Sequence, residues 1–293
     1  MILLLFFSFH HASADSIIDV RQGEYLARAA GCADCHSSNY GKDWSGGAPI
    51  RTPFGTFFAP NITPDEETGI GSWSQADFLL ALRAGISPKG YYYYPVFPYR
   101  AFTKMSDDDI GRIFAFVKTL KPVNRKSRPP DVPFRYSIRG TLEAWRWLYF
   151  TKVSNPERAV KIGYGPFRAV AERTAGWNRG AYLVEAVIHC TECHTPRTYL
   201  GGLEVDEWMA GTDMKLNGRT IPNITPDRET GLGSWTALDW YRFLSSGFTP
   251  ENHSPGGEMA DVIQGTSFLT SADRAAVAEY MMSLTPVSRR ADQ

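Results

Sequence analysis

The sequence has little cysteine, no excess of either charge and, after its first residues, no long apolar run. Only four of its 293 residues are cysteine, and 31 basic side chains balance 31 acidic ones. A neutral chain has no overall positive field of the kind that attracts nucleic acid, so we expect no nucleic-acid partner. No stretch reaches the roughly 18 uninterrupted apolar residues of a membrane-spanning helix, so we expect membrane association to be peripheral at most.

The four cysteines all fall in two short motifs. These are Cys32-Ala33-Asp34-Cys35-His36 and Cys190-Thr191-Glu192-Cys193-His194. Two thiols at this spacing on one helical turn can add to the two vinyl groups of haem, and the adjacent histidine can then bind the iron. A structural zinc site would instead need two cysteine pairs close together. The motifs predict two covalently bound haem c groups, with His36 and His194 as iron ligands, and they leave no cysteine for a disulfide or a catalytic thiol.

An internal repeat indicates that the chain is duplicated. Residues 60–73 and 222–235 differ at two positions only, and both begin with Pro-Asn-Ile-Thr-Pro-Asp. A Gly-x-Tyr-Leu segment also precedes each haem motif, beginning at Gly23 and at Gly180. The sequence therefore predicts two copies of one structural unit.

The order of expected elements is the same in each copy. A helix runs into the haem motif, a Gly- and Pro-rich surface loop follows, and two more helices complete the copy. Gly85 and Gly247 are placed to end the middle helices, and Ser106 and Thr270 are placed to cap the last ones. This is the layout of a small cytochrome c domain, so we predict an all-α protein.

The two predicted cytochrome c domains, residues 15–123 and 176–288, are separated by a segment without a counterpart in the repeat. Residues 124–175 begin basic and proline-rich and then carry a group of aromatic side chains, namely Trp145, Trp147, Tyr149 and Phe150. We predict an irregular linker whose aromatic side chains pack the two domains together. The alternative is a docking surface for another protein subunit, because tryptophan and arginine are enriched at interfaces.

Residues 1–14 predict a signal peptide. An apolar run that is too short to span a bilayer leads to the small residues Ala12, Ser13 and Ala14. We expect cleavage after Ala14 and a periplasmic location, which suits a haem that is attached outside the bacterial cytoplasm. The usual basic residues before the apolar run are missing, so the segment could instead stay on as a weak membrane tether.

The ligand on the second face of each iron decides what a haem can do. A thioether suits a high-potential electron carrier, an imidazole lowers the potential, and an open position permits chemistry on a small molecule. In the second copy we predict Met259, in a loop before the final helix, with His253 as the main alternative. The competing methionines, of which the last two are expected in a helix core, are Met209, Met214, Met281 and Met282.

The first copy has no ligand at the position that matches Met259, which falls near Phe97. Met105 is the only methionine of the mature first domain, so we predict that it binds the first iron. Two alternatives stay open. Met105 aligns with Leu269 and could be a core residue, and the iron could be open or bound by a tyrosine among residues 91–94.

Three other polar residues lie close to these motifs. His189 directly precedes the second haem motif and is expected to be structural rather than a ligand. Asn61 and Asn223 of the repeat could bind haem propionates, but their residue type favours the role of a turn anchor.

With both haem motifs, the repeated Pro-Asn-Ile-Thr-Pro-Asp and the segment Arg179-Gly-Ala-Tyr-Leu183, the chain resembles bacterial dihaem c-type cytochromes related to the cytochrome subunits of membrane-associated alcohol and gluconate dehydrogenases. The resemblance covers nearly the whole mature chain. It implies an electron donor that is a dehydrogenase and an acceptor in the respiratory chain. The alcohol dehydrogenase subunits carry a third haem domain and a C-terminal membrane helix, and we expect neither here. They also tend to carry Met in a Tyr-Pro-Ala-Met-Pro-Tyr segment, which reads Tyr94-Pro-Val-Phe-Pro-Tyr99 in this chain.

We therefore predict a periplasmic dihaem cytochrome c that carries electrons from a partner dehydrogenase to the respiratory chain, through a cytochrome or oxidase as acceptor. It would be an electron-transfer protein or subunit without catalysis of its own. The alternative is a dihaem enzyme of the peroxidase kind, with an open iron site in the first domain. A thiolate-bound active haem is excluded, because the two motifs use every cysteine.

Overall fold

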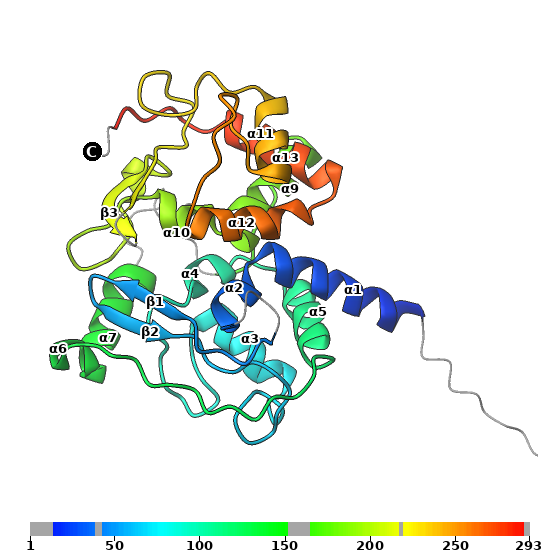
Figure 1. The fold of residues 1–293 in the computed structure, drawn as a ribbon, viewed down its shortest axis with the longest axis vertical. Helices are drawn as coiled ribbons and strands as arrows, with labels where there is room; N and C mark the ends of the chain where they lie inside the picture. The colour runs from blue at the N-terminus through cyan, green and yellow to red at the C-terminus, as the bar shows by residue number, and fades with distance from the viewer. Residues whose placement is uncertain (1–13, 39–42, 152–164, 217–218, 290–293) are drawn as a thin grey trace, which may run out of the picture.

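The computed structural model describes residues 14–38, 43–151, 165–216 and 219–289, and most of its regular structure is helical (Figure 1). The α-helices are α1 (Ala14–Ala29), α2 (Cys32–His36), α3 (Gln75–Ala84), α4 (Tyr99–Phe102), α5 (Asp107–Val117), α6 (Phe134–Ser137), α7 (Arg139–Arg146), α9 (Ala175–Tyr182), α10 (Cys190–His194), α11 (Ala237–Ser246), α12 (Glu258–Ser267) and α13 (Ser271–Met282). Two π-helical segments, η1 (Trp147–Thr151) and η2 (Leu183–Val187), and a 3₁₀ turn, η3 (Val205–Glu207), complete the helical elements. The predicted signal peptide lies outside the described residues except for Ala14.

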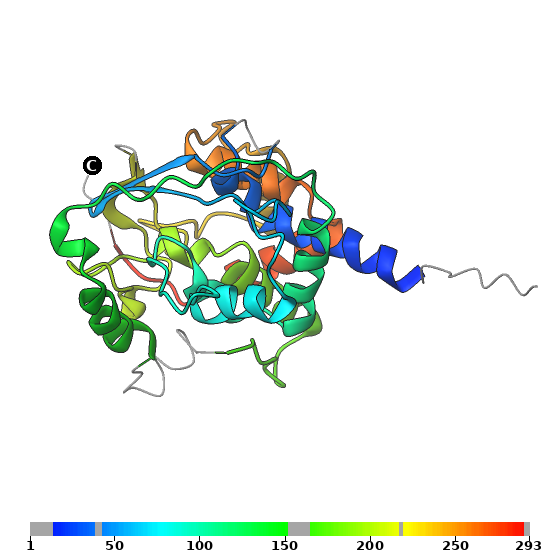
Figure 2. The ribbon, with the colours of Figure 1, turned by 90° about the horizontal axis from the view of Figure 1, so that it is seen from below.

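Two short antiparallel hairpins depart from the all-α prediction. The four strands are β1 (Pro49–Thr52), β2 (Gly55–Phe58), β3 (Thr212–Leu216) and β4 (Arg219–Ile221), with β1 paired to β2 and β3 paired to β4. Strands this short carry too little alternation to be recognised in a sequence. The first hairpin also depends on a distant partner, because Thr56 pairs with Asp131, and Figure 2 shows that later segment running beside the strands.

The middle helices end where the sequence predicts. Ser74 and Thr236 cap α3 and α11. In both helices the carboxylate of the third residue, an aspartate, accepts the backbone N–H of the capping residue, which completes a capping box. Gly85 and Gly247 end them with positive φ angles of 62° and 78°, which a residue without a side chain adopts at little cost. Residues 106 and 270 cap α5 and α13 as expected.

Each half contains a close helix crossing that requires glycine. Gly23 of α1 lies against α5, where a Cβ atom would come within 1.9 Å of the Arg112 carbonyl oxygen. Gly180 of α9 lies against α13, where a Cβ atom would come within 2.0 Å of the Ala276 carbonyl oxygen. The first helix of each half can therefore approach the last helix closely enough to bury the shared apolar face.

Reciprocal hydrogen bonds join the N-terminal half (residues 14–123) to the C-terminal half (residues 175–289). The Tyr25 hydroxyl of α1 donates to Asp273 of α13 over 2.6 Å, and the Tyr182 hydroxyl of α9 donates to Asp109 of α5 over 2.6 Å. Each hydroxyl also accepts the backbone N–H of the residue that caps the same helix. The tyrosine of each Gly-x-Tyr-Leu segment thus forms hydrogen bonds with the start of the last helix of the other half.

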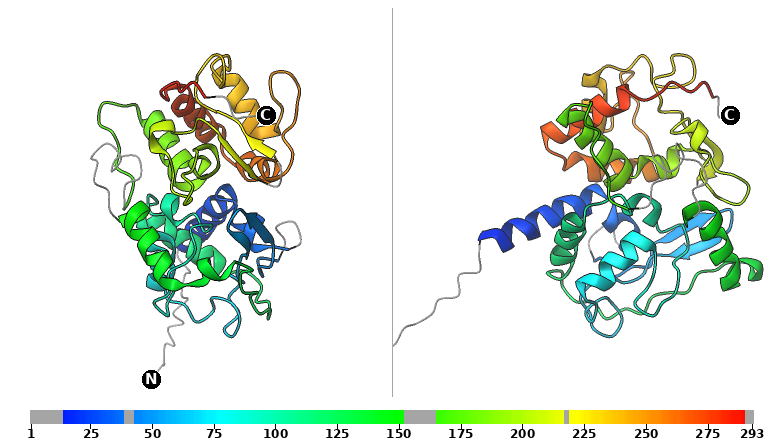
Figure 3. Two further views of the ribbon diagram at one scale, coloured as in Figure 1. Left: turned by 90° about the vertical axis from the view of Figure 1, so that its left-hand side faces the viewer. Right: turned by 180° about the vertical axis from the view of Figure 1, so that it is seen from behind.

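Helices also cross between the halves. Figure 1 shows α12 lying over α1 and the first haem motif, with the C-terminal half above the N-terminal half. At that crossing a Cβ atom on Gly265 would come within 2.6 Å of the Arg28 carbonyl oxygen. In the matching contact α4 packs against η2, which leads into the second haem motif. The far end of α1 projects from the body of the molecule (Figure 3).

The segment between the halves is helical over much of its described length, so the prediction of an irregular linker is wrong there. Phe150 is 1% exposed and packs edge-on against Tyr99, with 5.1 Å between ring centroids. The Trp145 indole donates to the Leu200 carbonyl over 2.8 Å. Trp147, in contrast, is 56% exposed. Some of the predicted aromatic side chains therefore contact both halves, whereas others face solvent.

Within the described ranges, no helix combines the length and the apolar character that a bilayer crossing requires.

We expect Gly180→Ala to lower the free energy of unfolding by about 2 kcal/mol, because the new methyl group must force α9 away from α13. Gly140→Ala is the matched control. Gly140 lies in α7, where an added Cβ atom would meet no atom of the described residues within 4 Å, and alanine is the better helix former by about 1 kcal/mol. Urea unfolding followed by circular dichroism measures both, and equal stability of the two variants would show that the crossing is not tight.

Candidate haem-binding sites

Each haem motif forms a single turn of helix, α2 or α10, that starts after a sharp change of direction. The preceding residues, Gly31 and His189, have positive φ angles of 63° and 49°. This turn separates each motif from the long helix before it and places two cysteines and a histidine on one short turn. His189 therefore has the structural position that we predicted, and its ring lies edge-on against Phe102 of the other half.

The two motif histidines are held in the same way. His36 Nδ1 lies 2.8 Å from the Pro60 carbonyl oxygen, and His194 Nδ1 lies 2.8 Å from the Pro222 carbonyl oxygen. A carbonyl oxygen can only accept, so each Nδ1 carries the hydrogen and Nε2 keeps its lone pair. Burial lowers the pKa of both imidazoles, which favours the neutral form that binds a metal. Both sites therefore fit a haem with histidine as a ligand.

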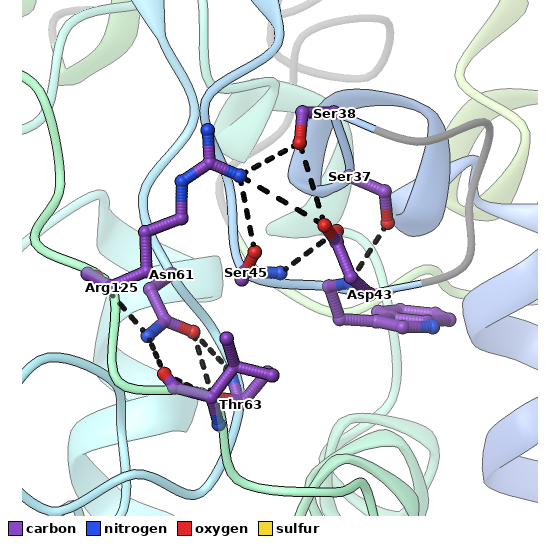
Figure 4. A network of polar contacts seen from close by, with 9 residues as sticks. Ser37, Ser38, Asp43, Ser45, Asn61, Thr63 and Arg125 are labelled. Carbon is purple, nitrogen blue, oxygen red and sulfur yellow. Dashed lines mark hydrogen bonds and ion pairs between the residues drawn. The ribbon is translucent and has the colours of Figure 1, made fainter.

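The loop that carries each proline is anchored by an asparagine. The Asn61 side chain accepts from the backbone N–H and the hydroxyl of Thr63 and donates to the Val123 carbonyl over 2.7 Å (Figure 4). Asn223 makes the same contacts with Thr225 and a carbonyl near the C-terminus. Because these amide groups bond within the protein, they act as turn anchors and hold the carbonyl that orients the histidine.

An arginine ties the first site's surrounding loop to the segment after α5. Arg125 donates from Nη1 to the Ser38 hydroxyl over 2.7 Å and to the Ser45 hydroxyl over 3.3 Å, as Figure 4 shows. Ser45 is only 2% exposed, so the predicted surface loop is in fact packed inward at this point.

Met209 has a structural place that the sequence did not reveal. Its backbone N–H bonds to the Thr195 hydroxyl over 3.1 Å, as Trp44 bonds to the Ser37 hydroxyl over 2.9 Å. Both Met209 and Trp44 are buried and have positive φ angles. Met209 therefore matches a core tryptophan of the first half. The loops before the two residues differ in length, so an alignment by spacing does not detect the match.

Met259 lies in the first turn of α12, whereas the prediction placed it in a loop. Its side chain is half-buried. Its neighbour Glu258 is close enough to raise the pKa of the Cys193 thiol, which places this turn near the second motif. His253 is exposed. Of the helix methionines, Met281 is 2% exposed and Met282 is 46% exposed, and the side chain of Met214 lies outside the described residues.

Met105 is fully buried, and its counterpart Leu269 is 2% exposed. Burial suits a core residue and an iron-bound thioether alike, so ligation by Met105 stays a prediction. A tyrosine ligand is less favourable. Burial raises the pKa of Tyr93 to about 12, which disfavours the phenolate, and Tyr91 is 49% exposed.

The two motifs lie close together. Burial raises the pKa of the Cys35 thiol to about 12, and Asp34 and the Cys193 thiol of the second motif contribute to the same shift. A contribution between the two thiols requires that they be near neighbours. The two attachment points therefore lie near each other at the contact between the halves.

The third position of each motif carries an acid, and the two acids have different surroundings. Burial raises the pKa of Asp34 to about 7, and the carboxylate of Asp261 adds to the rise. Burial also acts on Glu192, but the guanidinium groups of Arg197 and Arg100 outweigh it and hold the pKa of that carboxyl below its ordinary value. Arg197 lies 2.7 Å from Glu192.

We expect Asn61→Ala to destabilise the haem-loaded protein by about 2 kcal/mol, because it leaves buried backbone groups without partners around the carbonyl that holds His36. Asn124→Ala is the control. Its amide makes one exposed bond to Glu67, so its loss should cost less than about 0.5 kcal/mol. Chemical unfolding followed through the Soret band measures both, and an unaffected Asn61 variant would contradict the proposed anchoring.

Comparison with known proteins shows which family the chain belongs to. The Cytochrome c family profile matches residues 20–121. A diheme cytochrome c-type protein of Cereibacter sphaeroides is 40% identical over 90% of this chain and 85% of its own length. The gluconate 2-dehydrogenase cytochrome c subunit of Pantoea cypripedii is 35% identical over 90% of this chain. The cytochrome c subunit of the quinone alcohol dehydrogenase of Gluconobacter oxydans is 34% identical over 95% of this chain.

The chain spans 59% of the gluconate dehydrogenase subunit and 57% of the alcohol dehydrogenase subunit, but most of the diheme relative. The likeness extends over both haem motifs and both repeats. The chain therefore belongs to the cytochrome c family, among the dihaem c-type cytochromes and the related cytochrome subunits of dehydrogenases.

Proposed function

We propose that this protein is a periplasmic dihaem cytochrome c that carries electrons one at a time from a partner dehydrogenase to a cytochrome or oxidase of the respiratory chain. The observation that carries the proposal is the matched pair of histidines, each with Nδ1 held 2.8 Å from a proline carbonyl, in two motifs that lie close together. Haem, when bound, supplies one-electron oxidation and reduction at iron. The chain itself transforms no substrate.

The residues of the chain position and protect the two sites. Four cysteines anchor the cofactors, and the asparagine-anchored loops fix the rotation of His36 and His194. We propose Met105 and Met259 as the ligands opposite them. If these histidines and methionines hold the haem groups, they would keep small molecules from the iron and would limit the rearrangement that accompanies each change of charge.

The proposal includes the organisation expected from the sequence. The cytochrome c domains would be residues 15–123 and 176–288, and a signal peptide of residues 1–14 would direct export. The dehydrogenase cytochrome subunits among the relatives support a dehydrogenase as the donor. Any contact with the membrane would be peripheral. It would be made through the partner protein, or through the N-terminal segment if that segment is not cleaved.

The peroxidase-like alternative depends on an open iron in the first half. The position that matches Met259 falls near Phe97, whose ring lies 5.7 Å from the ring of Tyr93 and 5.8 Å from that of Phe102. Peroxide cleavage requires an acid or base beside the iron. Phe97 and Phe102 supply neither group. Burial raises the pKa of the Tyr93 hydroxyl to about 12, so Tyr93 is a poor proton donor and is not ionised to act as a base. This region therefore favours electron transfer.

We expect Met105→Ala and Met259→Ala each to remove about half of the sulfur-to-iron charge-transfer band of the ferric protein, because each would delete one of two thioether ligands. Met282→Ala is the control, since Met282 is 46% exposed at the end of α13 and should leave the band unchanged. Absorption spectra of the purified proteins give the measurement. A full band in Met105→Ala would assign Met105 to the core.

The same preparations separate the two functions. The wild-type chain should take up and release two electrons reversibly, should bind carbon monoxide slowly and should not consume hydrogen peroxide. Rapid carbon monoxide binding together with peroxide turnover by the wild-type protein would contradict the electron-carrier proposal and favour the enzyme.

A further inference from the structure

The two haem motifs are alike in geometry but differ in the charges around them. Asp34 and Glu192 occupy the same place in the two motifs, and the imidazoles beside them have carbonyl contacts of equal length, 2.8 Å. Arg125 and Arg289 are matching arginines, and the backbone N–H of each donates to a threonine of the repeat. Arg125 lies within 4 Å of the acidic side chain of Asp43, and Arg289 lies within 4 Å of those of Glu207 and Asp213. Those acids and arginines are partly exposed, so solvent screens them. The differing charges lie elsewhere.

Negative charge gathers at the first motif. Asp261 of α12 lies near enough to Asp34 and to Cys35 to raise the pKa of each. It is brought there by the crossing of α12 over α1, where Gly265 meets the Arg28 backbone. In the described part of the chain, no cationic side chain contributes to the shifts of Asp34 or of the two thiols in this motif.

Positive charge compensates the acid of the second motif. Arg197 pairs with Glu192 over 2.7 Å, and the side chains of both are mostly buried. Arg100 of α4 adds a second cation. Arg100 is 4% exposed, and among the described residues its Nε and Nη1 atoms have no hydrogen-bond partner. The negative charge of Glu192 is the main interaction that favours the charged form of Arg100.

Two further groups complete the second site. Lys104 lies 2.5 Å from Glu185, and this buried pair is neutral as a whole. Glu258 of α12 lies within electrostatic reach of Cys193 and adds one negative charge. Two cations therefore offset Glu192 and Glu258 at the second motif, whereas among the described residues no cation contributes in this way to Asp34 or Asp261 at the first.

We propose that these charges make the Cys32–His36 site the low-potential site and the Cys190–His194 site the high-potential site, so that electrons enter at the first and leave from the second. A ferric site carries one positive charge more than a ferrous one, so nearby carboxylates favour the oxidised state at the first site. The guanidinium groups remove that preference at the second site, where charges are poorly screened because they are buried.

With haem bound at both motifs, one electron would pass from the site of His36 to the site of His194. The first site would be oxidised by one electron as the second is reduced by one, and no bond or proton would be exchanged. An external reduced dehydrogenase supplies the electron, and an external oxidised cytochrome or oxidase removes it. This order rests on the proposed electron-carrier function and adds its direction.

Charge-neutralising variants of the haem-loaded protein test the order. A spectroelectrochemical titration at pH 8 should resolve two one-electron steps. Asp34→Asn, which keeps the Cys-x-x-Cys-His pattern, should raise the lower potential and leave the higher one in place, and Asp261→Asn should do the same. Arg100→Gln should lower the higher potential alone. Asp108→Asn, an exposed acid on α5, is the matched control and should move neither.

The outcomes separate this inference from the function on which it rests. If Asp34→Asn moves the higher step, or if both Asp34→Asn and Asp261→Asn leave the two potentials unchanged, the proposed order is wrong while the electron carrier stands. If the wild-type protein shows only one reducible haem, or reduction that cannot be reversed, the electron-carrier function itself is contradicted.

Discussion

The hydrogen bond from histidine Nδ1 to a proline carbonyl is the contact on which both sites depend. It selects the tautomer that leaves Nε2 to bind a metal, and it sets the rotation of the ring. A carbonyl can serve this role only if its loop is held in place. The near-identical repeats at residues 60–73 and 222–235 do this, because an asparagine in each bonds both to its own loop and to the segment after the last helix.

The two halves are interdependent in the structure. Each first helix sends its tyrosine to the cap of the other half's last helix, and α12 and α4 cross over the helices that lead into the opposite haem motif. Glycine at the tight crossings lets the backbones approach. Such packing brings the two haem motifs together, which short electron-transfer distances require, and it places charges of one half beside the cofactor site of the other.

The two halves share the backbone frame of the sites but not the surroundings of that frame. Trp44 and Met209 occupy the same backbone position, as do Gly31 and His189. Lys104 and Glu185 form a buried ion pair where α4 packs against η2. At the matching contact, between the halves near the first motif, Arg28 lies over the ring of Phe268 instead. The two motifs thus have different electrostatic environments although the histidine contacts have the same geometry.

The sequence by itself determined the features that depend on local chemistry. The haem motifs, the repeat and the helix caps at Gly85, Ser106 and Thr270 are set by neighbouring residues, so spacing and residue type were enough to predict them. Only the tertiary structure decided what depends on residues far apart in the chain. The first hairpin is bridged by the distant residue Asp131, Met209 matches a tryptophan across loops of unequal length, and Asp261 comes to Asp34 through a helix crossing. Such contacts leave no periodic signal in a sequence, because they are set by how the helices pack rather than by what each segment prefers.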